Sequence, residues 1–317
     1  MDDLADSRQL RARIAWLYHK ENMTQGEIGR VLGLTRLRVN RMLAECRARG
    51  LVQVTLDTGF ESCIELERRV VKEFGLADAV VIPTPRDPDK IQELVGQAAG
   101  QFLSRTLRHH KISSIGVGWG LTLGEAIRSM ERMDLPGTSV ISMMGGLTRG
   151  AEFNTFEIAS GLARRLHASC SYLVAPIYAG SSRSRDILIA QDVFAEVMAR
   201  MRSVDIAFLS LGDVTTRSLL IRYGLPDDLS REALLAAGAV GDVLGQFIDR
   251  DGTLISHEVN RRVVSLPLTD LRRIPTVILA AGGTHKAAVI KAALRGRLAH
   301  VLISDEATVQ RAVTPGA

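Results

Sequence analysis

The stretch from Thr24 to Leu43, TQGEIGRVLGLTRLRVNRML, has the spacing of two short helices joined by a tight turn. Gly29 falls where the two helices must cross closely, and Gly33 falls where the turn requires a positive φ. Val39 and Met42 fall where the second helix must bury side chains. The spacing predicts a helix-turn-helix. A helical hairpin of another use is the alternative, because such patterns also arise by chance.

The residues around this stretch predict how its helices begin. Residues 8–20 carry apolar side chains at helical spacing, which predicts a supporting first helix. Thr24 with Glu27 three positions later forms a capping-box pattern, and Thr35 is positioned to cap the third helix. The second helix is expected to bury the apolar residues Ile28, Val31 and Leu32.

The predicted third helix has two different faces when its residues are projected at 100° each. The face expected to pack inward holds Val39, Met42, Leu43 and Cys46. The opposite face carries arginine, asparagine and leucine, which suit guanine, adenine and the thymine methyl group in a major groove. Threonine, glutamine and a further arginine are better placed for phosphates. The predicted DNA-binding residues are Thr24, Gln25, Thr35, Arg36, Leu37, Arg38, Asn40 and Arg41.

Positive charge is concentrated in the same segment. Residues 8–50 hold 10 of the 40 basic residues but only 3 of the 35 acidic ones. All of the excess positive charge of the chain therefore lies in this segment, as expected for a surface that contacts phosphates. A solvated basic helix face is the alternative interpretation.

Length and composition limit the class of protein. A chain of 317 residues with 46% hydrophobic residues can bury a sizeable core in two or more domains. No apolar run approaches the roughly 20 residues needed to cross a bilayer. The acidic, polar start MDDLADSRQL does not resemble a secretory signal. The three cysteines are scattered, without metal-ligand spacing, so we expect a cytoplasmic protein with reduced thiols and no metal or cofactor.

Two elements are expected to connect the small domain to the rest. After Gly50, LVQVTL alternates and predicts a short strand, the wing of a winged helix or part of a hairpin. Residues 61–74 predict an amphipathic helix that either links or dimerises the domains, or packs at the edge of the second domain. The expected boundaries are 1–56, 57–77 and 78–317.

From Asp78 onward, apolar runs alternate with helical stretches. The helical stretches include residues 91–107, 155–167, 186–201 and 286–295. This alternation predicts a doubly wound, mostly parallel α/β domain with helices on both faces of the sheet. The expected strands are DAVVIP, SSIGVGW, TSVISMMGG, CSYLVAP, VDIAFLSL, TVILAAGG and HVLIS.

Glycine-rich loops follow three of these runs. Ligands of such sheets bind outside the carboxyl ends of the strands, so these loops can meet in one pocket. Exposed amides at a helix start, together with a lysine, suit an anion such as phosphate. Turn glycines and a solvated lysine are the alternative. The predicted effector-binding residues in these loops are Gly118, Trp119, Gly120, Thr122, Gly145, Gly146, Asn154, Gly283 and Lys286.

Acidic residues near the same strand ends are candidates for binding sugar hydroxyls. Asp242 is the preferred candidate and completes the predicted effector site. Asp213 can instead stabilise a turn, and Asp305 can instead cap the last helix. His285 either touches a ligand or lies on the surface. Trp119 either stacks on a sugar face or fills the core beside its loop.

Several segments taken together resemble the SorC-type bacterial sugar-responsive transcriptional regulators over nearly the whole chain. Beside the helix-turn-helix, they are IGVGWGLTL, GAVGDVLGQFIDRDG, HEVNRRVVSLPLTDLRRIP, AAGGTHKAAVIKAALRG and HVLISDEATV. The resemblance implies an effector domain similar in fold to sugar-phosphate isomerases, an oligomer of two or four subunits, and an operator as DNA partner. It assigns Gly118, Gly120 and Thr122 to an anion-binding loop and Lys286 to a phosphate contact.

The resemblance also has departures. Trp119 and Leu121 stand where the related enzymes favour small or hydroxyl residues, which favours an unphosphorylated sugar or polyol. The acid/base residues of those enzymes have no counterpart here. We therefore expect a regulator of a carbohydrate or polyol catabolic operon and not an enzyme. The alternatives are a sugar-phosphate isomerase or deaminase fused to a DNA-binding domain, and a structural nucleoid protein.

Overall fold

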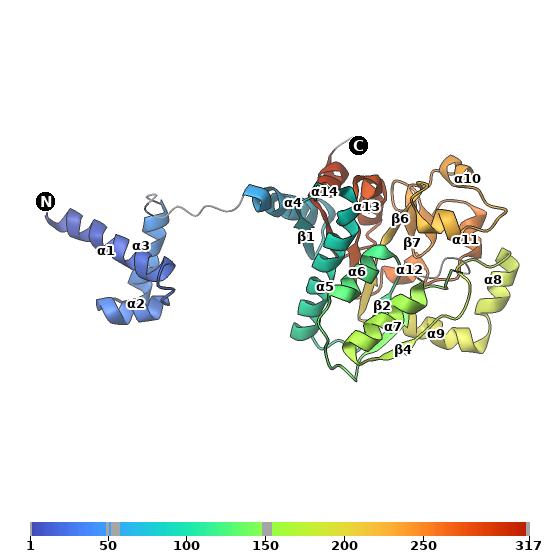
Figure 1. Cartoon of the computed structure of the whole chain (residues 1–317), viewed down its shortest axis with the longest axis horizontal. Coiled ribbons are helices and arrows are strands. Elements are labelled where there is room, and N and C mark those ends of the chain that lie inside the picture. Colours follow the sequence, from blue (N-terminus) through green and yellow to red (C-terminus); the bar gives the residue numbers. More distant parts are fainter. Residues whose placement is uncertain (1, 49–50, 52–57, 148–153, 315–317) are drawn as a thin grey trace. The chain divides into compact units, whose positions relative to one another are not determined.

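The chain divides into two compact units, Met1–Asp57 and Thr58–Ala317, which are described separately (Figure 1). The computed structural model describes residues 2–48, 51, 58–147 and 154–314. The strand expected at LVQVTL lies outside the described residues apart from Leu51.

The first unit is a three-helix arrangement built on the predicted turn. Helix α1 spans Asp2–His19, α2 spans Gln25–Leu32 and α3 spans Arg36–Ala48. The Thr24–Glu27 capping box is present at the start of α2. Gly33 ends α2 with φ +64°, the left-handed conformation that glycine adopts without strain.

The close approach of α2 to the turn that follows it explains why α2 contains a glycine. A Cβ at Gly29 would lie 2.6 Å from the carbonyl oxygen of Leu34, so a larger residue would push the turn away. The core of the unit consists of Ile14, Ile28, Val39, Met42 and Leu43. The expectation that Val31 is buried is wrong, because its side chain is 61% exposed. The apolar stripe of α2 is narrower than its sequence suggests.

The second unit is organised around a seven-stranded parallel sheet, and each of the seven predicted runs forms one of its strands. The order is β1-β10-β9-β5-β2-β3-β4. All six strand pairs are parallel. The strands are β1 Asp78–Ile82, β2 Ser114–Val117, β3 Ser139–Ser142, β4 Ser169–Ser171, β5 Ile206–Leu209, β9 Thr276–Ala280 and β10 Val301–Asp305.

Helices cover both faces of this sheet, as its apolar runs require. In β5, Ile206 and Phe208 pack into one core cluster, whereas Ala207 and Leu209 pack into the other. The first cluster contains α5 Ile91–His109, α6 Leu121–Ser129 and α7 Thr155–Leu166. The second contains α4 Thr58–Phe74, α9 Asp192–Arg202, α13 Ala287–Arg295 and α14 Glu306–Val313.

A smaller antiparallel sheet in the order β6-β7-β8 was not predicted. Its three strands are three residues each, which is too short for a periodic signal. The helix expected at 186–201 is in fact two helices, α8 and α9, separated at Ala190 and Gln191. The remaining elements are β6 Leu211–Asp213, β7 Gly241–Val243, β8 Gln246–Ile248, α8 Ser182–Ile189, α10 Arg231–Ala236, α11 Glu258–Arg262, α12 Leu268–Leu271, the 3-10 turns Pro88–Lys90 and Thr284–Lys286, and the π-helical turn Leu220–Gly224.

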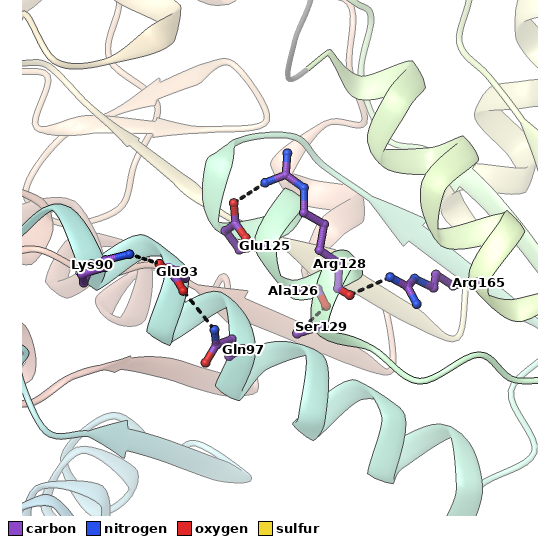
Figure 2. Close-up of polar contacts among 8 residues, drawn as sticks. All are labelled: Lys90, Glu93, Gln97, Glu125, Ala126, Arg128, Ser129 and Arg165. Carbon is purple, nitrogen blue, oxygen red and sulfur yellow. Dashed lines mark hydrogen bonds and ion pairs between the residues drawn. The ribbon is translucent and has the colours of Figure 1, made fainter.

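Helices α5 and α6 pack directly on each other through two glycines one turn apart on α5. A Cβ at Gly96 would lie 2.7 Å from the carbonyl oxygen of Thr122, and a Cβ at Gly100 would lie 2.3 Å from that of Ala126. Figure 2 shows the polar contacts around the two helices, among them the bond from Arg165 of α7 to the Arg128 carbonyl at the end of α6. Helix α6 is therefore held between α5 and α7.

We expect Gly100→Ala to lower the free energy of unfolding by about 1–3 kcal/mol, because its methyl group must displace the α6 backbone. Gly161→Ala on α7 is the matched control, since its Cβ would meet only Ile127 Cγ2 at an ordinary 3.5 Å. Urea denaturation measures both. Equal effects of the two substitutions would contradict the role given to Gly100.

Within the described residues, no helix is long and apolar enough to cross a membrane. The same residues contain no group of three or more histidine, cysteine, aspartate or glutamate side chains placed to hold a metal ion.

Candidate DNA-binding face and effector cavity

The outward face of α3 is exposed, and its inward face is buried, as the helical projection predicted. Leu37 is 80% exposed, and the neighbouring polar side chains Arg36, Arg38, Asn40 and Arg41 are exposed with it. An exposed leucine between arginines has no packing role within this unit. The face therefore presents hydrogen-bond donors around an apolar side chain, a combination that can meet base edges.

The two threonines of the predicted DNA-binding set act as helix caps. Thr24 Oγ1 accepts the Glu27 N–H at 3.3 Å, and Thr35 Oγ1 accepts the Arg38 N–H at 3.3 Å. Gln25 Nε2 lies 3.5 Å from Asn40 Oδ1, so the start of α2 and the middle of α3 are adjacent. Both hydroxyls are already engaged, so the caps orient the two helices.

A cavity of about 470 Å³ opens at the carboxyl ends of three adjacent strands of the large sheet. The loops that follow β2, β5 and β9 contribute Gly118, Ser210 and Gly282 to its wall. The chain leaves β2 toward β3 and β4 on one side, and later places β5 on the other side. Such a topological switch point is where open α/β sheets bind ligands, and the volume suits a small organic molecule.

The structure brings seven of the ten predicted effector residues to this cavity: Gly118, Trp119, Gly120, Thr122, Asp242, Gly283 and Lys286. It does not bring Gly145, Gly146 or Asn154 there. The Asn154 side chain instead binds the backbone N–H and carbonyl of Leu147. Gly145 is glycine because a Cβ would lie 2.6 Å from the Ala175 carbonyl oxygen. These three residues shape a loop and are not part of the cavity wall.

The first turn of α6 forms one side of the cavity. Gly120 precedes the helix with φ +120°, and no side chain caps it. The first amides of a helix have no partner within the helix, so an uncapped start carries partial positive charge. Leu121 and Thr122 of this turn line the cavity. Trp119 also lines it and packs against both core clusters, so it serves the core as well as the cavity wall.

Four ionisable residues that influence one another line the same cavity: Asp213, Asp242, His285 and Lys286. His285 Nε2 lies 3.6 Å from Asp213 Oδ2. Burial lowers the pKa of Lys286, although the carboxylates of Asp213 and Asp242 counteract this effect. Burial likewise lowers the pKa of His285, and Asp213 again opposes the shift. The cluster therefore places two carboxylates, an imidazole and the Lys286 amino group in one cavity wall, where Lys286 can meet an anionic or hydroxyl-rich occupant.

Asp242 is buried as deeply as Asp213, with only 3% of its surface exposed. Burial raises its pKa to about 7, against the opposing effects of the Gly245 N–H and Lys286. Its Oδ2 accepts the Gly245 N–H at 2.9 Å, whereas Oδ1 has no hydrogen-bond partner among the described residues. Gly212 makes room for this carboxyl, since a Cβ there would lie 1.9 Å from Oδ1.

Sequence reasoning left several cavity residues out of the predicted site. The sequence offers Asp213 and His285 as possible ligand contacts, with a turn role for Asp213 and a surface position for His285 as the alternatives. Asp213 does accept the Thr215 N–H at 2.6 Å, but it also lines the cavity. Arg217 and Ser218 line the cavity too, and no sequence signal marked them. Their position depends on the unpredicted small sheet.

Asp305 proves to be a cap, as the alternative interpretation held. Its carboxylate accepts the Thr308 N–H at the start of α14 and the Thr84 hydroxyl. It also accepts the Gly283 N–H at 2.8 Å. One buried carboxylate therefore joins the loop carrying Lys286 to the start of α14.

Residues 58–314 match the family model described as a putative sugar-binding domain, and residues 14–59 match the MarR family model. The chain belongs to the SorC-type family of sugar-binding transcriptional regulators. It is an effector-controlled, DNA-binding regulator and not an enzyme.

Known proteins are similar to this chain over almost its full length. The erythritol catabolism regulatory protein EryD of Brucella abortus is 29% identical over 98% of this chain and 97% of its own. The transcriptional regulator LsrR of Escherichia coli K12 is 30% identical over 94% and 92%. The full-length sorbitol operon regulator SorC of Klebsiella pneumoniae has the same fold, with a TM-score of 0.72 at 24% identity over 96% of this chain and 98% of that one.

The raised pKa of Asp242 predicts a pH-dependent stability. Its pKa of about 7 in the folded protein exceeds the ordinary 3.8, so folding takes up a proton between these values and stability falls as the pH rises from about 4 to about 7. Asp242→Asn removes this contribution. The free energy of unfolding of the wild type minus that of Asp242→Asn should fall by up to about 1.4 kcal/mol per pH unit in this window. Parallel pH profiles in urea denaturation would contradict the assignment.

Proposed function

We propose that the 470 Å³ cavity binds a sugar, sugar phosphate or polyol, and that its occupancy changes the affinity of the first unit for an operator. The observation that carries this proposal is that an uncapped helix start and a cluster of two buried carboxylates, a histidine and a lysine line the same cavity. Hydroxyl groups can donate to Asp213 and accept from Lys286. A phosphoryl group can instead meet the α6 amides and Lys286.

The control of a carbohydrate or polyol catabolic operon follows from the relatives' printed functions together with this cavity. The erythritol regulator acts on a polyol pathway and the sorbitol regulator on a polyol operon. Trp119 in the cavity wall offers an apolar face that can lie against the carbon side of a sugar or polyol. We infer an effector that is rich in hydroxyl groups.

Lys286→Ala tests whether the effector is a sugar phosphate or an unphosphorylated sugar or polyol. A thermal-shift screen of sugars, polyols and their phosphates on the full chain identifies a hit by its stabilisation. We expect a phosphorylated hit to bind Lys286→Ala about 10-fold more weakly or worse, because a hydrogen bond to a charged group contributes about 1.5–3 kcal/mol. Lys111→Ala, at an exposed position outside the cavity, is the control. An unchanged affinity for the phosphorylated hit excludes Lys286 as its contact.

The outward face of α3 is proposed to read the operator. The residues that would contact base edges are Arg36, Leu37, Asn40 and Arg41. Gln25 and Arg38 would contact phosphates of the DNA backbone. The caps Thr24 and Thr35 orient the helices and would lie beside the same DNA phosphates. One short reading helix contacts few base pairs. We therefore propose that the protein acts in the cytoplasm as a homo-dimer or homo-tetramer on paired half-sites.

Arg41→Ala should weaken binding to an operator selected from a random-sequence pool by about 1–3 kcal/mol, or roughly 5- to 150-fold. The Arg41 side chain is exposed, and its one polar contact among the described residues is an ion pair of 3.5 Å with Glu45, so its loss should leave the fold intact. Arg13→Ala, exposed on α1, serves as the control. Fluorescence anisotropy at one fixed salt concentration measures both. If Arg41→Ala binds as the wild type does, α3 does not read bases through this residue.

A route for the effector signal starts at the loop that carries Lys286. Asp305 joins this loop to α14, and Arg69 Nη2 of α4 donates to the Val313 carbonyl at the end of α14 with a distance of 2.8 Å. Helix α4 directly follows the segment that leads from the DNA-binding unit. We therefore propose a domain division near 1–56, 57–77 and 78–317, in which α4 transmits the state of the cavity.

A further inference from the structure

Basic residues gather where the chain enters β2, β3 and β4, at the edge of the sheet opposite the effector cavity. Helices α5, α6 and α7 end there, and we call residues 105–111, 128–134 and 164–167 together the basic edge. These three segments hold seven arginine and lysine residues against two acidic residues. Outside residues 8–50 the chain has slightly more acidic than basic residues, so this surplus of positive charge is local.

Contacts between the three segments make the basic edge a single surface. Arg165 Nη2 donates to the Arg128 carbonyl at 2.6 Å, as Figure 2 shows, and the Met133 N–H donates to the Arg165 carbonyl at 2.8 Å. An ion pair between Arg108 and Glu131 joins the end of α5 to the segment that follows α6. The charges of the three segments therefore act in one place.

Most of this positive charge is not neutralised by a carboxylate. Among the described residues, Arg108 and Arg128 lie in ion pairs, whereas Arg165 binds the neutral carbonyl of Arg128. Asp134 lies 2.6 Å from His167 Nδ1 and so faces a group outside the seven. The remaining four cationic residues are exposed and have no carboxylate partner in the described part of the chain: Arg105, Lys111, Arg132 and Arg164.

The composition of the basic edge favours a nucleic acid backbone over a protein partner. Six of its seven cationic residues are arginines, whose planar guanidinium groups bind two phosphate oxygens at once. A protein–protein interface has an apolar core. Among the described residues, none of the exposed large hydrophobic side chains lies in the three segments. Duplex DNA, which a regulator of this family binds, supplies closely spaced phosphates and requires no apolar contact.

We propose that the basic edge binds the phosphate backbone of duplex DNA, as a second DNA contact that does not read sequence. Each phosphate that a cationic side chain neutralises releases condensed counterions, so this contact adds affinity that depends on salt. The inference goes beyond the proposed function. The choice of operator belongs to α3 of the first unit, whereas the basic edge gives the second unit a hold on DNA of any sequence.

The test neutralises the four unpaired cationic residues together in the full chain, as Arg105→Gln, Lys111→Gln, Arg132→Gln and Arg164→Gln. Fluorescence anisotropy across a salt series measures binding to a duplex of random sequence. The logarithm of the affinity falls with the logarithm of the salt concentration by about 0.9 for each phosphate contact. We expect the slope of this variant to be shallower by about 2–4, with binding at least about 10-fold weaker at about 0.1 M salt.

The matched control neutralises four exposed arginines of the same unit outside the basic edge: Arg183→Gln, Arg222→Gln, Arg250→Gln and Arg297→Gln. Both variants lose four positive charges, so the control measures the effect of net charge alone. Arg222 stacks over the Tyr223 ring at 4.9 Å, as Arg105 stacks over the Phe102 ring at 5.2 Å. The loss of one stacked arginine is therefore common to both variants, and the slope of the control should stay close to that of the wild type.

A second variant covers the case in which the glutamines disturb the fold. Arg105→Lys, Arg132→Lys and Arg164→Lys together keep the charge and should retain the wild-type slope. The proposal is overturned if the glutamine variant has the wild-type slope, which would leave an acidic protein as the partner. Equal changes in the glutamine variant and the control, or an equal loss in the lysine variant, also overturn it. Arg41→Ala removes base reading but should leave the slope difference intact, so the proposed function fails separately.

Discussion

The contact between α5 and α6 is the constraint on which the effector cavity depends. Gly96 and Gly100 let the two helix backbones touch, and no other residue would fit without moving α6. Since α6 begins at the edge of the cavity, this contact fixes where its uncapped amides point their partial charge. The packing of α5 on α6 therefore places the first turn of α6 in the cavity wall, to which the start of α5 also contributes Ile91 and Gln92.

The charged cluster shows how a buried site keeps its groups ready for a ligand. Asp242 lies against Gly212, and its burial leaves the carboxyl half-protonated near neutral pH. Asp213 and Lys286 stand beside it in the same wall. A neutral polyol and an anion would have different effects on the charges of these groups. We therefore propose that the site distinguishes ligands by charge as well as by shape.

Much of the fold was readable from the sequence, because a parallel strand buried on both faces appears as a continuous apolar run. Each of the seven runs became a strand, and the Gly33 turn and the Thr24–Glu27 cap formed as expected. The site was readable only in part. Asn154 binds the Leu147 backbone instead of lining the cavity, and Asp213 reaches the cavity because β6 follows β5 after a single residue. Such placements depend on tertiary contacts between short elements without periodicity of their own.

The two faces of α3 have separate duties, and this separation bears on how such proteins diversify. Val39, Met42 and Leu43 hold the helix in its unit, whereas Leu37, Asn40 and Arg41 contribute nothing to that core. If this face reads DNA as we propose, substitutions on it alter which DNA sequence is preferred at little cost to folding. Duplicated copies of such a gene can acquire new target sites by a few surface changes while retaining an intact sensor. The same property makes the outward face of α3 a suitable place to engineer regulators that do not cross-react.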